Sequence, residues 1–243
     1  MLLKRYLPVL IAILALLLLT PLKLEFFTFR PTGAQAGLVS QPAWPAISTA
    51  RVIPQIVSAD LNADGQPENL RLEDGRVQIM QDSQAAWRSP ADWQVTQALI
   101  GDLDGDGRPE VDLLVWRPFR PWPVDRFLPY GGRIDVFQDS QGRSCHLILI
   151  AWRDGAFRER WAGSALAEPL RSFAAVDLDG DGRQELVALE TAYDDPPSSP
   201  ARALSVWSWN GFGFSLLARQ NGPFRQLAVY ASPVLEPFLL LQR

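Results

Sequence analysis

The sequence has one cysteine, Cys145, and one histidine, His146, among its 243 residues. A single cysteine excludes an intramolecular disulfide, and one cysteine with one histidine excludes a zinc cluster of these residue types. Because neighbouring side chains of a strand point to opposite faces, we do not expect this adjacent pair to act as nucleophile and base. The chain also lacks a nucleophile elbow, a zinc-protease motif and a phosphate-binding loop, so the common classes of enzyme find no support.

Long helical segments are scarce as well. The chain contains 20 prolines and 17 glycines, which favour short elements joined by turns. Nine tryptophans and 12 phenylalanines supply large apolar surfaces for a core. Without its N-terminal segment the chain keeps roughly 200 residues, which is enough for one sizeable domain. The composition therefore predicts an all-β domain.

One long hydrophobic run is present, at the N-terminus. Lys4 and Arg5 precede an apolar run over residues 7–22, which is the layout of a signal peptide or a signal anchor. Residues 34–36 resemble a signal peptidase site, but they lie further past the apolar run than such sites usually do. We therefore expect an uncleaved anchor rather than a cleaved signal, with a cytoplasmic N-terminus and an extracytoplasmic domain.

Three regions are expected along the chain. Residues 1–24 are predicted to form a transmembrane or signal helix that attaches the protein to the membrane. Residues 25–50 contain prolines and glycines among small polar residues, which is typical of a linker whose end can join the fold. Residues 51–243 are expected to form the folded domain, either anchored to the membrane or secreted.

Negative charge is concentrated in three short stretches, residues 60–68, 102–110 and 177–185. The net charge is only −4, yet these stretches hold 11 of the 27 acidic residues. Each stretch has oxygen-bearing side chains at its positions 1, 3 and 5, a glycine at position 6 and a glutamate at position 9. Carboxylates packed this closely repel one another unless a cation lies among them.

The spacing is that of a calcium-binding loop. Calcium takes about six to eight oxygen ligands, and the glycine lets the backbone turn around the ion. Position 7 can add a backbone carbonyl and position 9 a carboxylate. The predicted ligands of up to three Ca²⁺ ions are Asp60, Asn62, Asp64, Gln66 and Glu68; Asp102, Asp104, Asp106, Arg108 and Glu110; and Asp177, Asp179, Asp181, Arg183 and Glu185. The first loop is the weakest, because Asn62 is neutral and Ala63 replaces a glycine.

The loops are not EF-hands, since position 12 carries no glutamate and the flanking residues have strand character rather than helix character. Each loop is expected to join two strands. A second hairpin is expected after the second stretch, with its turn at Asp154-Gly155, and another after the third stretch, with its turn at Asn210-Gly211. Each unit then has four strands, which is the size of a propeller blade.

These loops between short apolar strands resemble the FG-GAP/VCBS repeat, the calcium-binding blade of integrin-type and bacterial surface β-propellers. The sequence departs from that family by a glutamate at position 9, by missing Phe-Gly and Gly-Ala-Pro signatures, and by a low number of units. The resemblance implies a small or incomplete β-propeller of three calcium-loop blades plus a degenerate fourth. Residues 224–231 and 237–242 resemble the first two strands of that fourth blade, with Glu236 at the end of a segment that replaces the calcium loop. Residues 38–52 either supply missing strands and close the ring, or the C-terminus caps an open stack.

The most unusual connection is the insertion Arg117–Arg143, which is rich in proline, arginine and aromatic residues. Long insertions of this kind are either functional loops or decorated solvent loops. The candidate partner-binding residues are Arg117, Phe119, Arg120, Trp122, Arg126, Phe127 and Tyr130. The expected function is a non-enzymatic, extracytoplasmic calcium-binding module that interacts with a protein or glycan at the cell envelope. The alternative is a glycosidase-like envelope hydrolase that uses the face opposite the calcium loops; a nucleic-acid partner is not expected for an acidic secreted chain.

Overall fold

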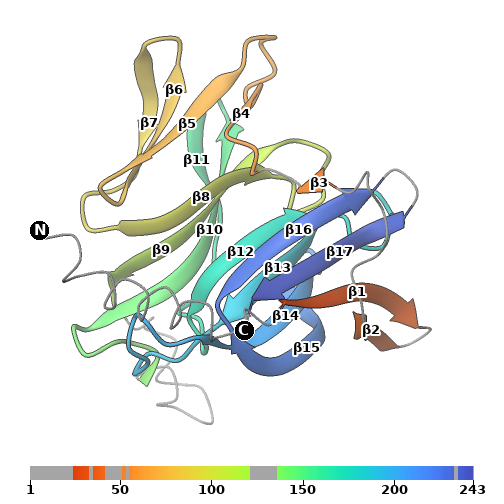
Figure 1. Ribbon diagram of the computed structural model, residues 1–243. Coiled ribbons are helices and arrows are strands. Elements are labelled where there is room, and N and C mark those ends of the chain that lie inside the picture. Colours follow the sequence, from red (N-terminus) through yellow and green to blue (C-terminus); the bar gives the residue numbers. More distant parts are fainter. Residues whose placement is uncertain are drawn as a thin grey trace, which may run out of the picture.

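The computed structural model describes residues 24–32, 35–41, 51–52, 55–120, 136–232 and 235–242. Within these residues the chain forms 17 β-strands and no α-helix (Figure 1), which confirms the all-β class. The strands make four antiparallel sheets, and none of the sheets closes on itself.

Three sheets have four strands each, and their strands follow one another along the chain. The first sheet contains β4 (Ser58–Ala59), β5 (Glu68–Glu73), β6 (Arg76–Gln81) and β7 (Gln84–Arg88). The second contains β8 (Gln94–Gly101), β9 (Glu110–Pro118), β10 (Arg143–Arg153) and β11 (Ala156–Ala162). The third contains β12 (Leu170–Val176), β13 (Glu185–Glu190), β14 (Ala201–Trp209) and β15 (Phe214–Phe224).

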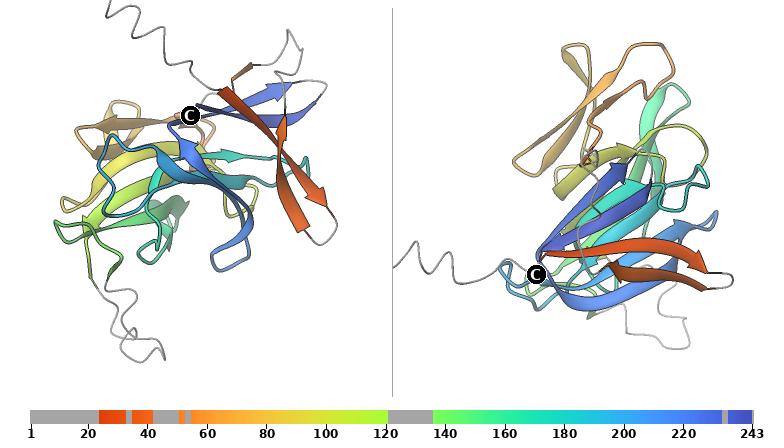
Figure 2. Two further views of the ribbon diagram at one scale, coloured as in Figure 1. Left: turned by 60° about the horizontal axis from the view of Figure 1, so that its bottom comes forward. Right: turned by 45° about the vertical axis from the view of Figure 1, so that its right-hand side comes forward.

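The fourth sheet joins the two ends of the chain. Its strand order is β2 (Gln35–Gln41), β1 (Leu24–Thr32), β17 (Leu235–Gln242), β16 (Gln226–Ser232) and β3 (Arg51–Val52). Leu24 of β1 pairs with Gln242 of β17. Both views of Figure 2 show the red β1–β2 hairpin next to the dark blue β16–β17 pair.

This sheet corrects the expectation of a linker for residues 25–32 and 35–41, while residues 42–50 lie outside the described part of the chain. Sequence reasoning gave weight to the prolines and glycines, but Phe26, Phe27 and Phe29 of β1 are buried. Phe27 packs edge-on against Phe224 of β15, with 6.1 Å between the ring centroids. The added strands therefore lie mainly at residues 24–41, earlier in the chain than the predicted 38–52.

Apolar side chains fill the spaces between successive sheets. One buried cluster joins the first and second sheets, another joins the second and third, and the last joins the third and fourth. Among the described residues no cluster joins the fourth sheet back to the first. A hollow of about 230 Å³ lies between the sheets and is lined among others by Ile56, which precedes β4, by Ile100 of β8, by Val176 of β12 and by Val229 of β16.

The predicted hairpins form with small differences. The β10–β11 turn is Asp154-Gly155, and both residues have positive φ, 51° and 77°. The β14–β15 turn has four residues, because Asn210 accepts hydrogen bonds from the backbone N–H groups of Phe212 and Gly213. Each turn thus lies where the sequence indicated.

The predicted N-terminal helix of residues 1–24 lies outside the described residues except for Leu24, which begins β1. In the part of the chain that the structure describes, no helix has the length and apolar character needed to cross a membrane.

Candidate calcium-binding loops

The three acidic stretches occupy equivalent places in the first three sheets. Each connects the first strand of its sheet to the second: β4 to β5, β8 to β9, and β12 to β13. The glutamate at position 9 begins the second strand in all three cases, as Glu68, Glu110 and Glu185. The strands therefore fix both ends of each loop.

The aspartate at position 1 organises each loop by accepting backbone hydrogen bonds. Asp102 accepts from the N–H groups of Asp106 and Gly107, both at 3.0 Å. Asp60 and Asp177 likewise accept two backbone N–H groups each from their own loops. These hydrogen bonds wrap the backbone around the carboxylates, so the loop forms from local interactions.

The wrapped backbone explains the glycines. Position 6 has a φ of 82–87° in all three loops and is always glycine, the residue that adopts this region without strain. Position 4 also has positive φ, at Gly105, Gly180 and Ala63. Ala63 at φ 61° costs on the order of 1 kcal/mol or more, which is a physical reason for the weaker first loop.

The glutamate at position 9 turns inward and is buried in each loop. One carboxylate oxygen of Glu110 accepts hydrogen bonds from the N–H groups of Leu103, at 2.8 Å, and Asp104, at 3.2 Å. Glu68 and Glu185 accept from Leu61 and Leu178 in the same way, at 2.8 Å. The other oxygen of Glu68 is buried without a hydrogen-bond partner, which is a position that a cation would satisfy.

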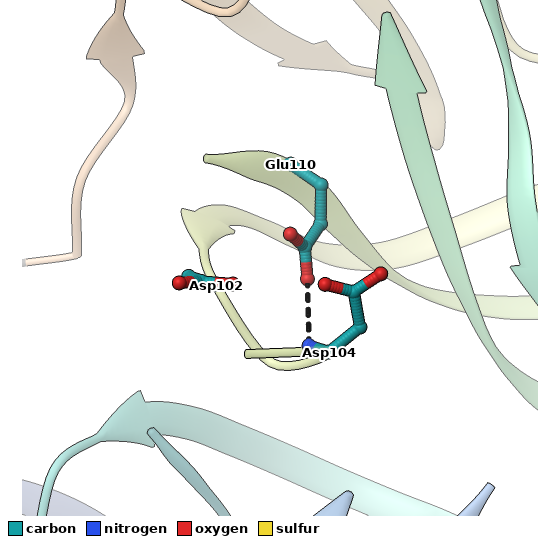
Figure 3. Close-up of side chains that lie close together, drawn as sticks. All are labelled: Asp102, Asp104 and Glu110. Carbon is teal, nitrogen blue, oxygen red and sulfur yellow. Dashed lines mark hydrogen bonds between the residues drawn. The ribbon is translucent and has the colours of Figure 1, made fainter. Parts of the chain in front are cut away.

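The second and third loops bring three carboxylates together. Carboxylate oxygens of Asp102, Asp104 and Glu110 lie within 4.8 Å of one another (Figure 3), and the equivalent oxygens of Asp177, Asp179 and Glu185 do the same. Among the described residues, the first loop forms no such group. A set of carboxylate oxygens at this spacing could hold a metal ion that prefers oxygen ligands.

The other predicted ligands lie at the outer edge of the loops. The exposed aspartates at position 5, Asp64, Asp106 and Asp181, accept hydrogen bonds from the backbone N–H groups of Gln66, Arg108 and Arg183. The position-5 carboxylates are not part of the close groups of three. The role of Gln66, Arg108 and Arg183 as carbonyl ligands stays a prediction.

Burial and mutual repulsion make the clustered carboxyls hard to ionise. The pKa of Glu185 is raised to about 7, chiefly by burial; a hydrogen bond from Leu178 opposes the shift, and the Asp179, Asp181 and Asp177 carboxylates contribute to it. Burial is also the main cause of a raised pKa at Glu110, where Asp104 adds to it. A bound cation would relieve both causes, because it offsets the lost hydration and the repulsion.

In the second loop, an arginine side chain of the same chain forms an ion pair with one of the clustered carboxylates. Nε of Arg160, on β11, lies 2.6 Å from Oδ2 of Asp104, whose side chain is almost completely buried. The guanidinium of Arg183 from the third loop lies beside Gly105. Within the described residues, the third loop has no ion pair of this kind. Of the two loops that gather three carboxylates, the third is therefore the one without an arginine ion pair.

Asp112 is a buried carboxylate that the motif does not include. It lies on β9 at position 11 of the second loop, where the other two loops have Leu70 and Val187. Both of its oxygens are buried without a hydrogen-bond partner. Burial, with a contribution from Glu110, raises its pKa well above the usual range. The only sequence signal was an acid two residues beyond Glu110, on the same face of a strand.

The predicted partner-binding residues divide between described and undescribed parts of the chain. Arg117 is partly buried, with its guanidinium 5.9 Å from the ring centroid of Trp93. Phe119 donates its backbone N–H to Gly142, and the exposed Arg120 forms an ion pair with Asp92 at 3.1 Å. The remaining candidates lie outside the described residues: Trp122, Arg126, Phe127 and Tyr130.

Cys145 and His146 lie on β10, and His146 pairs with neither Cys145 nor a carboxylate. Its Nε2 is 2.7 Å from Oγ of Ser144, and its Nδ1 is 2.9 Å from the carbonyl oxygen of Gly163. The imidazole therefore donates from Nδ1 and accepts from the serine at Nε2. Burial lowers the pKa of His146 to about 4, so the ring is neutral at pH 7.

No family model matches the sequence, and no curated protein matches it significantly. The likeness to the FG-GAP/VCBS repeat thus stays a prediction that rests on the three loops.

Proposed function

We propose that this chain is an extracytoplasmic calcium-binding module with a propeller-like fold, and that it interacts with a protein or glycan at the cell envelope. The observation that carries the proposal is the shared geometry of the three loops. Each lies between the first two strands of its sheet, is wrapped around a position-1 aspartate, and buries a position-9 glutamate. Two of them gather three carboxylates within 4.8 Å.

In this proposal the four sheets are the blades of a small propeller. The packing of successive sheets through buried clusters supports it, as does a hollow that residues of all four sheets or of the segments next to them line. The fourth blade combines β16 and β17 from the C-terminus with β1 and β2 from the N-terminus. A blade that contains both ends of the chain holds the first and last parts of the fold together.

Calcium has a structural role in this proposal. The Asp and Glu carboxylates would coordinate the ion, while the loop backbone is already held by hydrogen bonds to the same side chains. A ligand that binds the native state alone stabilises it by mass action. Extracellular calcium modules bind at about 0.1 to 1 mM, so 10 mM calcium would add about 1 to 3 kcal/mol for each site.

Thermal unfolding of the full chain with calcium or with a chelator tests the proposal. We expect 10 mM calcium to raise the melting temperature by several degrees, and magnesium to raise it less because it requires a tighter octahedral site. Asp179→Asn should reduce the calcium-dependent increase, since Asp179 belongs to the loop without a competing arginine.

Glu159→Gln is the matched control for this experiment, because Glu159 is an exposed acid on β11 outside the loops. It should keep the full calcium-dependent increase. A melting temperature that is the same in calcium and in chelator would contradict the proposal.

A further inference from the structure

A second candidate binding site lies away from the calcium loops, between the second and third sheets. It is a cavity of about 250 Å³ whose walls come from β10, β11, β12, β13, β14, β15 and the segment 163–168. This volume is slightly below the range of about 300–1,000 Å³ that is typical of small-molecule pockets. The cavity therefore suits a ligand smaller than a drug or a disaccharide.

Most of the cavity wall is apolar. Four leucines and three aromatic residues, Trp161, Trp207 and Phe214, line it. The indole N–H of Trp161 donates to the carbonyl oxygen of Phe212, and that of Trp207 donates to Oγ of Ser205, both at 2.8 Å. Since both indole donors are already used, the two tryptophans offer a ligand carbon and π surface rather than hydrogen bonds.

The charged groups of the cavity are acidic. Glu190 and Glu168 line it, and its lining contains no lysine or arginine. Glu190 is 2 % exposed and accepts a hydrogen bond from Nε of Arg219 at 2.7 Å. Glu168 is about half exposed and lies 3.8 Å from the same guanidinium. Two carboxylates share one guanidinium, so a net negative charge remains beside the aromatic wall.

We propose that this cavity binds a small organic cation, an ammonium group carried by a short aliphatic chain. The leucines and the aromatic rings would bury the chain. Aromatic faces attract cations, and the second carboxylate supplies the counter-charge that Arg219 leaves unmet. A carbohydrate would leave many hydroxyl groups unpaired against these leucines. This binding site goes beyond the proposed function, and it does not require calcium in the loops.

Calorimetric titration of the full chain with four probes of similar length tests this inference. The probes are hexylammonium, 1-hexanol, hexanoate and Nα-acetyl-lysine N-methylamide. We expect hexylammonium to bind about tenfold more tightly than 1-hexanol, since one added charge pair beside aromatic rings contributes on this scale. Hexanoate should not bind. The lysine derivative tests whether the cavity accepts the lysine side chain of a partner protein as well as a free amine. Binding of either cation supports the proposal.

Two substitutions connect the binding to the cavity. Glu168→Gln should weaken hexylammonium about fivefold and leave 1-hexanol unchanged, because it removes charge and keeps the shape. Glu168 is half exposed, so this variant should fold normally. Glu159→Gln, an equally conservative change of an exposed glutamate that does not line the cavity, should change neither probe.

Titrations in calcium and in chelator separate this inference from the proposed function. Cation binding in a chain that does not respond to calcium would uphold the cavity and contradict the calcium loops. The inference is overturned if hexylammonium fails to bind, if it binds no more tightly than 1-hexanol, or if Glu168→Gln and Glu159→Gln have equal effects.

Discussion

Asp112 of β9 has both carboxylate oxygens buried without a hydrogen-bond partner. Because burial penalises the charged form, Asp112→Asn should raise the free energy of unfolding by about 1 to 3 kcal/mol at pH 8 in chelator. The gain should shrink as the pH falls towards 3.8, the pKa of the carboxyl in the unfolded chain, because the unfolded chain then approaches the protonated form that the folded chain already holds. Urea unfolding at the two pH values measures it.

Asp82→Asn is the control for this prediction. Asp82 is exposed in the β6–β7 turn, at a φ of 53° that asparagine tolerates, so its substitution should change stability by less than about 0.5 kcal/mol. A loss of stability in Asp112→Asn at pH 8 would mean that the charged carboxylate has a favourable partner in solution.

His146 predicts how stability depends on acid pH. Its folded pKa, about 4, lies below the unfolded value of 6.5, so the unfolded chain binds more protons between these values. Stability from this residue is therefore complete above pH 6.5 and is lost as the pH falls to 4, by up to about 3 kcal/mol. Unfolding of the parent chain and of His146→Asn across this range should give a steeper slope for the parent; parallel slopes would contradict the prediction.

At the scale of single residues, the sequence predicts the acidic residues of the loops well, but it does not predict isolated buried polar residues such as Asp112. The spacing identified Asp102, Asp104 and Glu110, which the structure brings together. The local hydrogen bonds to position 1 explain this success, because a loop that folds around its own side chains is encoded locally. The sequence did not reveal Asp112, because its burial depends on distant residues. Its carboxylate lies next to Gly101, and so do Ala175 and Gln184 from the third sheet and its loop.

At the scale of the elements, the β10–β11 hairpin reaches the second candidate calcium-binding loop. It carries Arg160, whose guanidinium pairs with Asp104 at 2.6 Å. A calcium ion at the second loop must compete with this cation. Arg160→Gln should therefore raise the calcium affinity of the second loop several-fold, since an opposing charge within contact distance is removed.

Calorimetric calcium titration in an Asp179→Asn background, which weakens the third loop, measures this change. Arg158→Gln is the matched control, because Arg158 is exposed on the same strand and has no ion pair among the described residues. Equal calcium affinities in the parent, Arg158→Gln and Arg160→Gln would contradict the competition.

Elements were predictable where a turn signal bounds them. Asp154-Gly155 and Asn210-Gly211 located two hairpins, and the acidic loops located the strands on both sides. The sequence predicted a linker where β1 lies, because β1 pairs with β17, more than 200 residues later in the chain. No local sequence pattern indicates so distant a partner.

At the scale of the whole molecule, β1 and β2 make the N-terminal part of the described chain a component of the folded domain. Phe27 of β1 is 3 % exposed and packs on Phe224. Phe27→Ala should lower the free energy of unfolding by about 3 to 5 kcal/mol, the usual cost of emptying a buried phenylalanine site. Urea unfolding followed by far-ultraviolet circular dichroism measures it.

Val39→Ala on the neighbouring β2 is the control for this substitution. Val39 is 37 % exposed, so its loss should cost less than about 1 kcal/mol. If Phe27→Ala unfolds at the same urea concentration as the parent chain, the hairpin does not contribute to the cooperative core.

The pairing of β1 with β17 also determines when the fold can be completed during synthesis. Synthesis proceeds from the N-terminus, and Leu24 must wait for Gln242, its partner in the finished sheet, which comes more than 200 residues later. At about 5 to 20 residues per second, this wait lasts on the order of ten seconds or longer. The first three sheets can assemble in that time from strands already made, while Phe26, Phe27 and Phe29 still lack β17. The fold can thus be completed only after β17 has been made, and the nascent chain is exposed to aggregation until then.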